Sequence, residues 1–93
     1  MSHVTVLDFY AEWCQPCKQI SKILPHFEKS IAGIGSVEKV NIEEQTDLTE
    51  AFGIRSVPTF VLMQDGIEVD RVVGVIPLAQ LEERVKKIAY REI

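Results

Sequence analysis

Apolar residues along the chain change their spacing from one segment to the next, and each spacing is typical of one kind of secondary structure. Residues 3–10 (HVTVLDFY) form a nearly continuous apolar run that only Thr5 and Asp8 interrupt. Runs of this kind, rich in β-branched and aromatic side chains, are typical of strands buried on both faces. Further strands are predicted at residues 36–42 (SVEKVNI), 59–64 (TFVLMQ) and 67–73 (IEVDRVV). Asp65-Gly66 between the last two is a strong hairpin signal.

Helices are predicted between and after these strands. Over residues 17–32, apolar side chains recur at the three- and four-residue spacing of a helix with one buried face. Gly33 and Gly35 follow, and we expect both to end this helix by adopting positive φ angles. A short helix is predicted at residues 48–52, and a last one begins with Pro77 in its first turn.

The order of these elements is β-α-β-α-β-β-α. A strand-helix-strand unit favours parallel pairing of its two strands, whereas a hairpin pairs its strands antiparallel. The sequence therefore predicts an α/β fold with a mixed four-stranded sheet and helices on both faces. With 93 residues, we expect one domain over residues 1–93.

Composition and charge narrow the classes of function. Hydrophobic residues make up 46% of the chain and charged residues 26%, as in ordinary globular proteins. Ten basic residues against fourteen acidic ones give a net charge of −4, without a basic block, which argues against a nucleic-acid partner. No stretch approaches the roughly 18 consecutive apolar residues of a membrane helix, and the first residues do not resemble a secretory signal. We therefore expect no binding to nucleic acids or membranes.

Cys14 and Cys17 are the two cysteines of the chain. The loop that they close is too short to link distant segments, which excludes a disulfide scaffold. They follow a buried strand and begin a helix, where unpaired N–H groups and the helix dipole stabilise a thiolate. Such positions lower a cysteine pKa from about 8.5 to about 3.5–7.5, and the thiolate is the attacking species. The spacing, with the second sulfur one helical turn along, indicates a redox pair.

Two other interpretations of this pair are a pair of small buried residues and a metal site. Zinc normally takes four ligands, and beyond the cysteines the chain offers only His3 and His26. His26 lies within a predicted helix, where we expect it on the surface. The strand-loop-helix context favours redox chemistry, so we expect no metal.

Several separated motifs together resemble those of the thioredoxin family. Residues 6–14 (VLDFYAEWC) with residues 16–18 (PCK) resemble its active-site signature, and residues 53–60 (GIRSVPTF) resemble the stretch that holds its cis-proline. Residues 65–66 and 73–74 fall at its turn and substrate-loop positions. The match runs over almost the whole chain. It implies a thioredoxin fold with strand order 2-1-3-4, without the usual first strand and helix, so that residues 36–42 form an edge strand.

The resemblance implies thiol–disulfide exchange at the two cysteines. Cys14 would be the exposed nucleophile that attacks a substrate disulfide, and Cys17 the resolving thiol. Asp8 is the one charge in its apolar strand, so burial should raise its pKa. The resemblance gives Asp8 the role of proton acceptor for Cys17, through water, and places Lys39 nearby, where it would moderate the pKa of Asp8.

The resemblance also implies a shallow apolar groove around Cys14 for substrate proteins. A cis peptide bond before Pro58 would aim the Val57 backbone at an incoming peptide, which would pair with it like a strand. Trp13 is expected to be partly exposed. The expected substrate-binding residues are Trp13, Gln15, Pro16, Ile42, Val57, Pro58, Val73, Gly74 and Val75.

The resemblance therefore implies a protein-disulfide reductase. Because the chain shows no secretory signal and such cysteines are usually catalytic in the cytosol, we expect a cytoplasmic protein, acting as a monomer. It would bind no cofactor and would receive electrons from thioredoxin reductase and NADPH. Most thioredoxins carry glycine where this chain has Gln15, which leaves the preferred direction of electron transfer open, because the residues between the cysteines help to set the redox potential.

Two alternatives to this function remain. One is a glutathione-coupled, glutaredoxin-like oxidoreductase, which the short N-terminus favours and which Trp13 and the Gln-Pro dipeptide oppose. The other is a binding module that uses the groove without catalysis, although no feature of the sequence marks an inactive site.

Overall fold

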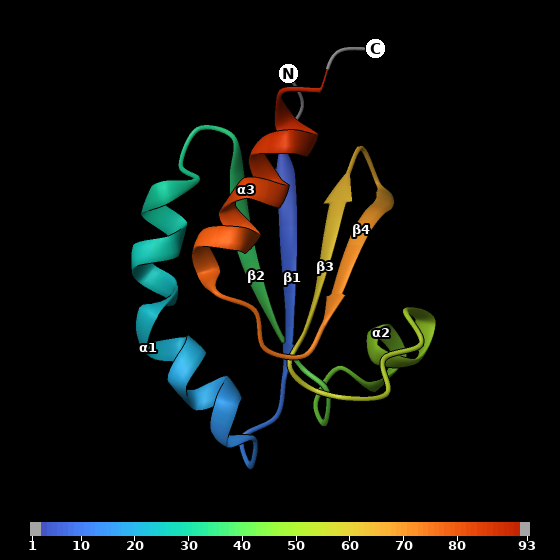
Figure 1. Ribbon diagram of the computed structural model, residues 1–93. Helices are drawn as coiled ribbons and strands as arrows, with labels where there is room; N and C mark the ends of the chain where they lie inside the picture. Colours follow the sequence, from blue (N-terminus) through green and yellow to red (C-terminus); the bar gives the residue numbers. More distant parts are fainter. Residues whose placement is uncertain (1–2, 92–93) are drawn as a thin grey trace.

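The computed structural model describes residues 3–91, and Figure 1 shows a central sheet with three helices around it. The strands are β1 (Val4–Tyr10), β2 (Gly35–Asn41), β3 (Thr59–Gln64) and β4 (Ile67–Val73). The helices are α1 (Gln15–Ser30), α2 (Thr46–Ala51) and α3 (Leu78–Ala89). The predicted order of strands and helices is therefore confirmed.

The sheet has the strand order β2-β1-β3-β4, as expected. β1 pairs parallel with β2 and antiparallel with β3, and β3 pairs antiparallel with β4. The hairpin between β3 and β4 turns at Asp65 and Gly66, whose φ angles are 54° and 77°. Two consecutive positive φ angles are typical of the tight turns that suit the twist of neighbouring strands.

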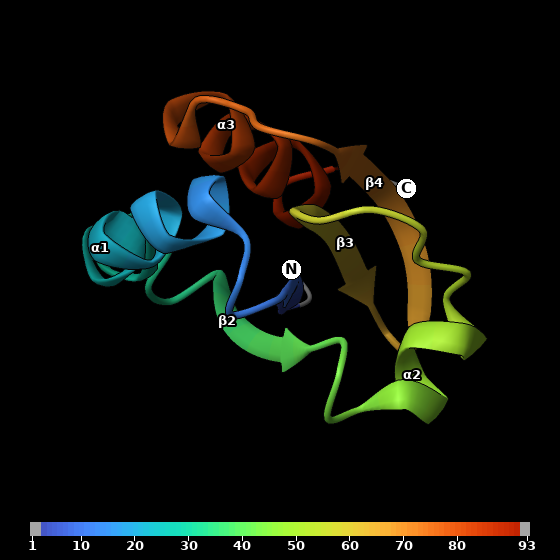
Figure 2. The ribbon, with the colours of Figure 1, turned by 90° about the horizontal axis from the view of Figure 1, so that it is seen from below.

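The two faces of the sheet carry separate cores, and Figure 2 shows α1 and α3 on one side of the sheet with α2 on the other. Val4 and Val6 of β1 pack into the core under α1 and α3. Leu7 and Phe9 pack into the core that includes Leu48 of α2 and Phe52 at its C-cap. Because side chains alternate along a strand, both faces of β1 are buried, which explains its nearly continuous apolar run. Asp8 falls on the face under α1 and α3.

Helix α1 differs from its prediction at both ends. It begins at Gln15, ahead of Cys17, and ends at Ser30. Gly33 has a φ angle of 91° and follows the helix end as expected. Gly35 does not adopt positive φ, and its prediction is wrong: it is the first residue of β2, and a Cβ atom there would lie 2.6 Å from the Val4 carbonyl oxygen. Close backbone approach therefore explains this glycine.

Other element ends also shift by one or two residues. Strand β2 ends at Asn41, although the Ile42 N–H still donates to the Tyr10 carbonyl at 3.0 Å. Helix α2 begins at Thr46, and Pro77 is the N-cap of α3 and not a residue of its first turn. Within residues 3–91, no helix is long and apolar enough to cross a membrane.

Candidate active site

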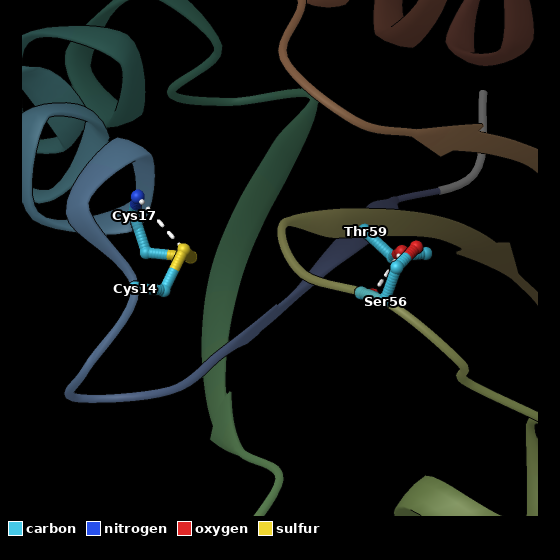
Figure 3. Close-up of a disulfide and its surroundings, with 4 residues drawn as sticks. All are labelled: Cys14, Cys17, Ser56 and Thr59. Atoms are coloured by element: carbon cyan, nitrogen blue, oxygen red, sulfur yellow. Dashed lines mark hydrogen bonds between the residues drawn. A yellow bond between two sulfur atoms is a disulfide. The ribbon is translucent and has the colours of Figure 1, made fainter.

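Cys14 and Cys17 lie at the N-terminus of α1, where the chain turns after β1. The Cys14 N–H donates to the Ala11 carbonyl at 3.1 Å, and Cys14 takes an extended conformation as the N-cap of α1. Its Sγ accepts a hydrogen bond from the Cys17 N–H at 3.2 Å. The two residues form a disulfide, with their Cα atoms 5.3 Å apart (Figure 3). The sulfur of Cys14 therefore sits at the positive end of the helix dipole.

The expectation that Cys14 is exposed is wrong for this disulfide form. The exposed fraction is 4% for Cys14 and 6% for Cys17. Both pack with Ala11, and Tyr10, Ile42 and Val57 pack against the three, which explains their burial. The exposed neighbour is Trp13, with an exposed fraction of 63%.

The segment that leads into β3 completes this end of the sheet. The Val57–Pro58 peptide bond is cis, as the resemblance implied, and Val57 packs against the cysteine cluster. The Thr59 hydroxyl donates to the Ser56 carbonyl at 2.8 Å, and Figure 3 draws this bonded pair together with the disulfide. The Gly74 N–H donates to the Pro58 carbonyl at 2.8 Å. This hydrogen bond joins the segment around Pro58 to the segment around Gly74, and both segments are expected to bind substrate.

The other residues expected in the groove differ in their surroundings. Pro16 and Val75 line the same cavity, beside α1. Val73 is paired with Thr59 in the sheet and is 65% exposed, and Gln15 is also exposed. Among the described residues, Trp13 and Val73 belong to no packed apolar cluster, so their side chains are free to contact another molecule.

Asp8 is buried in β1, the strand that leads into the site, with an exposed fraction of 3%. Burial raises the pKa of Asp8 to about 6, and the positive charge of Lys39 partly opposes that rise. Lys39 on β2 is the register partner of Asp8 on β1. The structure therefore brings together the two residues that the resemblance had placed side by side.

Two residues around Lys39 were absent from the sequence-based site. The Lys39 Nζ donates to the Ser21 hydroxyl at 3.0 Å and lies 4.6 Å from the centroid of the Tyr10 ring. Ser21 follows Cys17 by one helical turn and so lies on the same helix face, which is the signal that could have found it. The contact with Tyr10 depends on the pairing of β1 with β2, which residue spacing does not reveal.

A cavity of about 300 Å³ opens beside Cys17, and Tyr10, Ser21 and Lys39 also line it. At about 30 Å³ for each water molecule, it has room for several. Within the described residues, no hydrogen bond joins Asp8 to Cys17 directly, and no group of three or more His, Cys, Asp or Glu side chains is placed to share a metal ion. The cavity offers space for water between Cys17 and the Lys39 ammonium.

Comparison with known proteins places this geometry in one family. The family model "Thioredoxin" matches residues 1–87. A thioredoxin of Chlamydia caviae is 42% identical over 71 residues, which cover 76% of this chain and 69% of the relative. A thioredoxin of Mycoplasma pneumoniae is 40% identical over 84 residues, which cover 88% of this chain and 79% of the relative.

Solved structures agree with the sequence relatives. A thioredoxin variant from Halobacterium salinarum matches with a TM-score of 0.83 and 31% identity, over 97% of this chain and 77% of that chain. Thioredoxin-2 of a malaria parasite matches with a TM-score of 0.86 and 27% identity, over 92% of this chain and 84% of that chain. With its Cys14–Cys17 pair, the protein is a thiol–disulfide oxidoreductase that reduces protein disulfides. The chain belongs to the thioredoxin family.

Proposed function

We propose that the protein reduces substrate proteins in the cytoplasm with electrons from thioredoxin reductase, and ultimately NADPH, and so contributes to cell redox homeostasis. It acts as a monomeric domain without a bound cofactor. The observation that carries this proposal is the position of the Cys14 Sγ, which accepts the Cys17 N–H at the N-terminus of α1. A thiolate formed there is stabilised by the same N–H group and by the helix dipole.

The proposed reaction is a pair of sulfur exchanges. The reduced Cys14 thiolate attacks one sulfur of a substrate disulfide, forms a mixed disulfide and releases the other substrate sulfur as a thiolate. The Cys17 thiolate then attacks the Cys14 sulfur, and the second substrate sulfur leaves. Two electrons have moved from the cysteine pair to the substrate, and the pair ends as the Cys14–Cys17 disulfide. Thioredoxin reductase restores the dithiol.

Asp8 is the proposed proton acceptor for the Cys17 thiol. With a pKa of about 6, its carboxyl group is ionised at pH 7 and is a stronger base than an ordinary aspartate. The cavity beside Cys17 extends to Lys39, the register partner of Asp8, and has room for the water that would carry the proton. Lys39 moderates the pKa of Asp8, because its positive charge favours the carboxylate.

The proposed substrate groove surrounds the cysteine pair. The Val57 backbone pairs with an extended substrate segment, and exposed Trp13 and Val73 supply apolar contact. The complete set of proposed contacts is Trp13, Gln15, Pro16, Ile42, Val57, Pro58, Val73, Gly74 and Val75. Backbone pairing and apolar contact require no particular substrate sequence, which suits an enzyme that accepts different substrate proteins.

An insulin-reduction assay tests the electron source. NADPH consumption is measured with thioredoxin reductase in one arm and with glutathione and glutathione reductase in the other. We expect turnover in the first arm only, and no turnover with the Cys14→Ser variant. Turnover with glutathione alone supports the glutaredoxin-like alternative and contradicts the proposal.

A further inference from the structure

A second cavity opens beside Pro16, between α1 and the segment that leads from β4 into α3. Its volume is about 450 Å³. Pro16, Gln19, Ile20 and Ile23 of α1 form one wall, and residues 75–78 form the other. Gln19 is the one polar residue in this lining, and the cavity shares no residue with the one beside Lys39. It is therefore a separate and almost wholly apolar site.

The α1 wall combines buried and exposed side chains on one helix face. Pro16, Ile20 and Ile23 recur at the spacing that places residues on the same side of a helix. Ile20 is buried and supports the cavity floor, whereas Ile23 is 52% exposed. Val75 on the opposite wall is 69% exposed. Contiguous apolar side chains exposed around a hollow are typical of an interaction site.

The cavity lies next to the redox site. Pro16 lies between the two cysteines in the sequence. Val75 follows Gly74, whose N–H donates a hydrogen bond to the Pro58 carbonyl. A substrate that presents a disulfide to Cys14 therefore has part of its chain beside the cavity mouth. A neighbouring hollow of about 280 Å³ shares Ile23 and Leu78 with it, so the apolar surface continues between α1 and α3.

The cavity begins at Pro16, close to Cys14, and extends along α1 to Ile23. Its distance from Cys14 therefore limits which substrate residue, counted from the attacked cysteine, can enter it. Pro16 and Ile23 are about two helical turns apart, which is about 10 Å along α1. An extended peptide advances about 3.3 Å per residue, so it covers this distance in about three residues. We propose that the cavity binds one large apolar side chain of the substrate protein, two to four residues from the attacked cysteine. This proposal rests on the protein-disulfide reductase function and adds a sequence preference to it.

A positional scan of disulfide peptides tests this preference. Leu replaces Ser at one position at a time, on both sides of the attacked cysteine, and the protein is reduced beforehand with dithiothreitol so that no reductase is needed. We expect Leu at one position, two to four residues from the cysteine, to raise kcat/KM by about tenfold. Equal rates for all positions, or a preference only next to the cysteine, would overturn the proposal.

Ile23→Ser and the matched control Ile67→Ser connect the preference to the cavity. Ile67 is 64% exposed and lies on β4 beside the hairpin turn, at the opposite end of that strand from Val73. We expect Ile23→Ser to remove the tenfold preference and Ile67→Ser to keep it. Retention of the full preference in Ile23→Ser contradicts the assignment.

Reduction of hydroxyethyl disulfide, which has no side chain to fill the cavity, separates this proposal from the general function. We expect both variants to reduce it at the wild-type rate. If the wild-type protein reduces neither this compound nor the peptides, the reductase function itself fails. If it reduces all of them and Ile23→Ser behaves like wild type with every peptide, only the cavity proposal fails.

Discussion

Asp8 and Lys39 are direct register partners in the parallel pair of β1 and β2. The carboxyl group is buried, and the Lys39 ammonium reaches α1, where it bonds to Ser21. Burial outweighs the attraction of the ammonium, so the pKa of Asp8 rises to about 6. The fold therefore pairs a carboxyl group whose pKa is about 6 with Lys39, which lines the same cavity as Cys17.

The raised pKa of Asp8 predicts a loss of stability as pH increases. Between the unfolded value of 3.8 and the folded value of about 6, the folded protein holds a proton that the unfolded chain releases. The free energy of unfolding therefore falls through this window and stays lower above it, by about 3 kcal/mol at 1.36 kcal/mol per pH unit. We expect Asp8→Asn to be more stable than wild type at pH 8 by up to that amount.

Urea unfolding from pH 4 to pH 8 measures this difference. The control is Glu38→Gln, which changes an exposed carboxyl group on β2. We expect the control to follow the wild-type pH dependence and Asp8→Asn to lack the fall. Parallel curves for Asp8→Asn and wild type would contradict the assigned pKa.

Asp8→Asn should lower the rate of disulfide reduction, although it raises the stability of the fold. Without a proton acceptor, we expect Asp8→Asn to reduce insulin about 100-fold more slowly at pH 7. The deficit should shrink toward pH 9, because a thiol with a pKa of about 8.5 then loses its proton unaided. If Asp8→Asn reduces insulin at the wild-type rate at pH 7, Asp8 is not the proton acceptor.

Lys39→Met predicts a shift in the pH dependence of the rate. Loss of the ammonium charge removes the one influence that lowers the pKa of Asp8, so this pKa rises further above 6. We expect the acid limb of the pH–rate profile to move to higher pH. Lys22→Met, on the exposed surface of α1, is the control and should leave the profile in place. If the pH–rate profile of Lys39→Met matches that of the wild type, Lys39 does not influence the proton transfer.

Gly35→Ala predicts a loss of stability where β2 begins. The added Cβ would lie 2.6 Å from the Val4 carbonyl oxygen, which is too close, so the two strands must move apart. Overpacking of this kind costs about 1–3 kcal/mol. Glu38→Ala, at an exposed residue of the same strand, should stay within about 0.5 kcal/mol of wild type. Equal unfolding midpoints in urea for the two variants would contradict the close approach.

Much of the fold follows from local patterns in the sequence. The bounds of β3 and β4 match their prediction because Asp65-Gly66 marks the turn between them. The start of α1 was missed because its N-cap is a cysteine, and not the Ser, Thr, Asp or Asn that usually marks a helix start. Gly35 was misassigned because the contact that requires glycine comes from β1, which is distant in sequence.

Only the part of the site whose residues are reactive and lie close together in the sequence could be predicted. The cysteine pair can be recognised from its position between a strand and a helix. The contacts of Lys39 with Ser21 and Tyr10 depend on strand register and on how α1 lies over the sheet, which spacing does not encode. The apolar cavity beside Pro16 was also missed, because its second wall comes from the loop before α3.

Trapping of the mixed disulfide tests the central claim, that Cys14 attacks the substrate and Cys17 resolves the intermediate. Reduced Cys17→Ser and Cys14→Ser variants are mixed with a disulfide-containing protein, and the adducts are identified by non-reducing electrophoresis and mass spectrometry. We predict a stable one-to-one adduct through Cys14 in the Cys17→Ser variant and none in the Cys14→Ser variant. An adduct through Cys17 in the Cys14→Ser variant, with none in the other, would contradict the assignment.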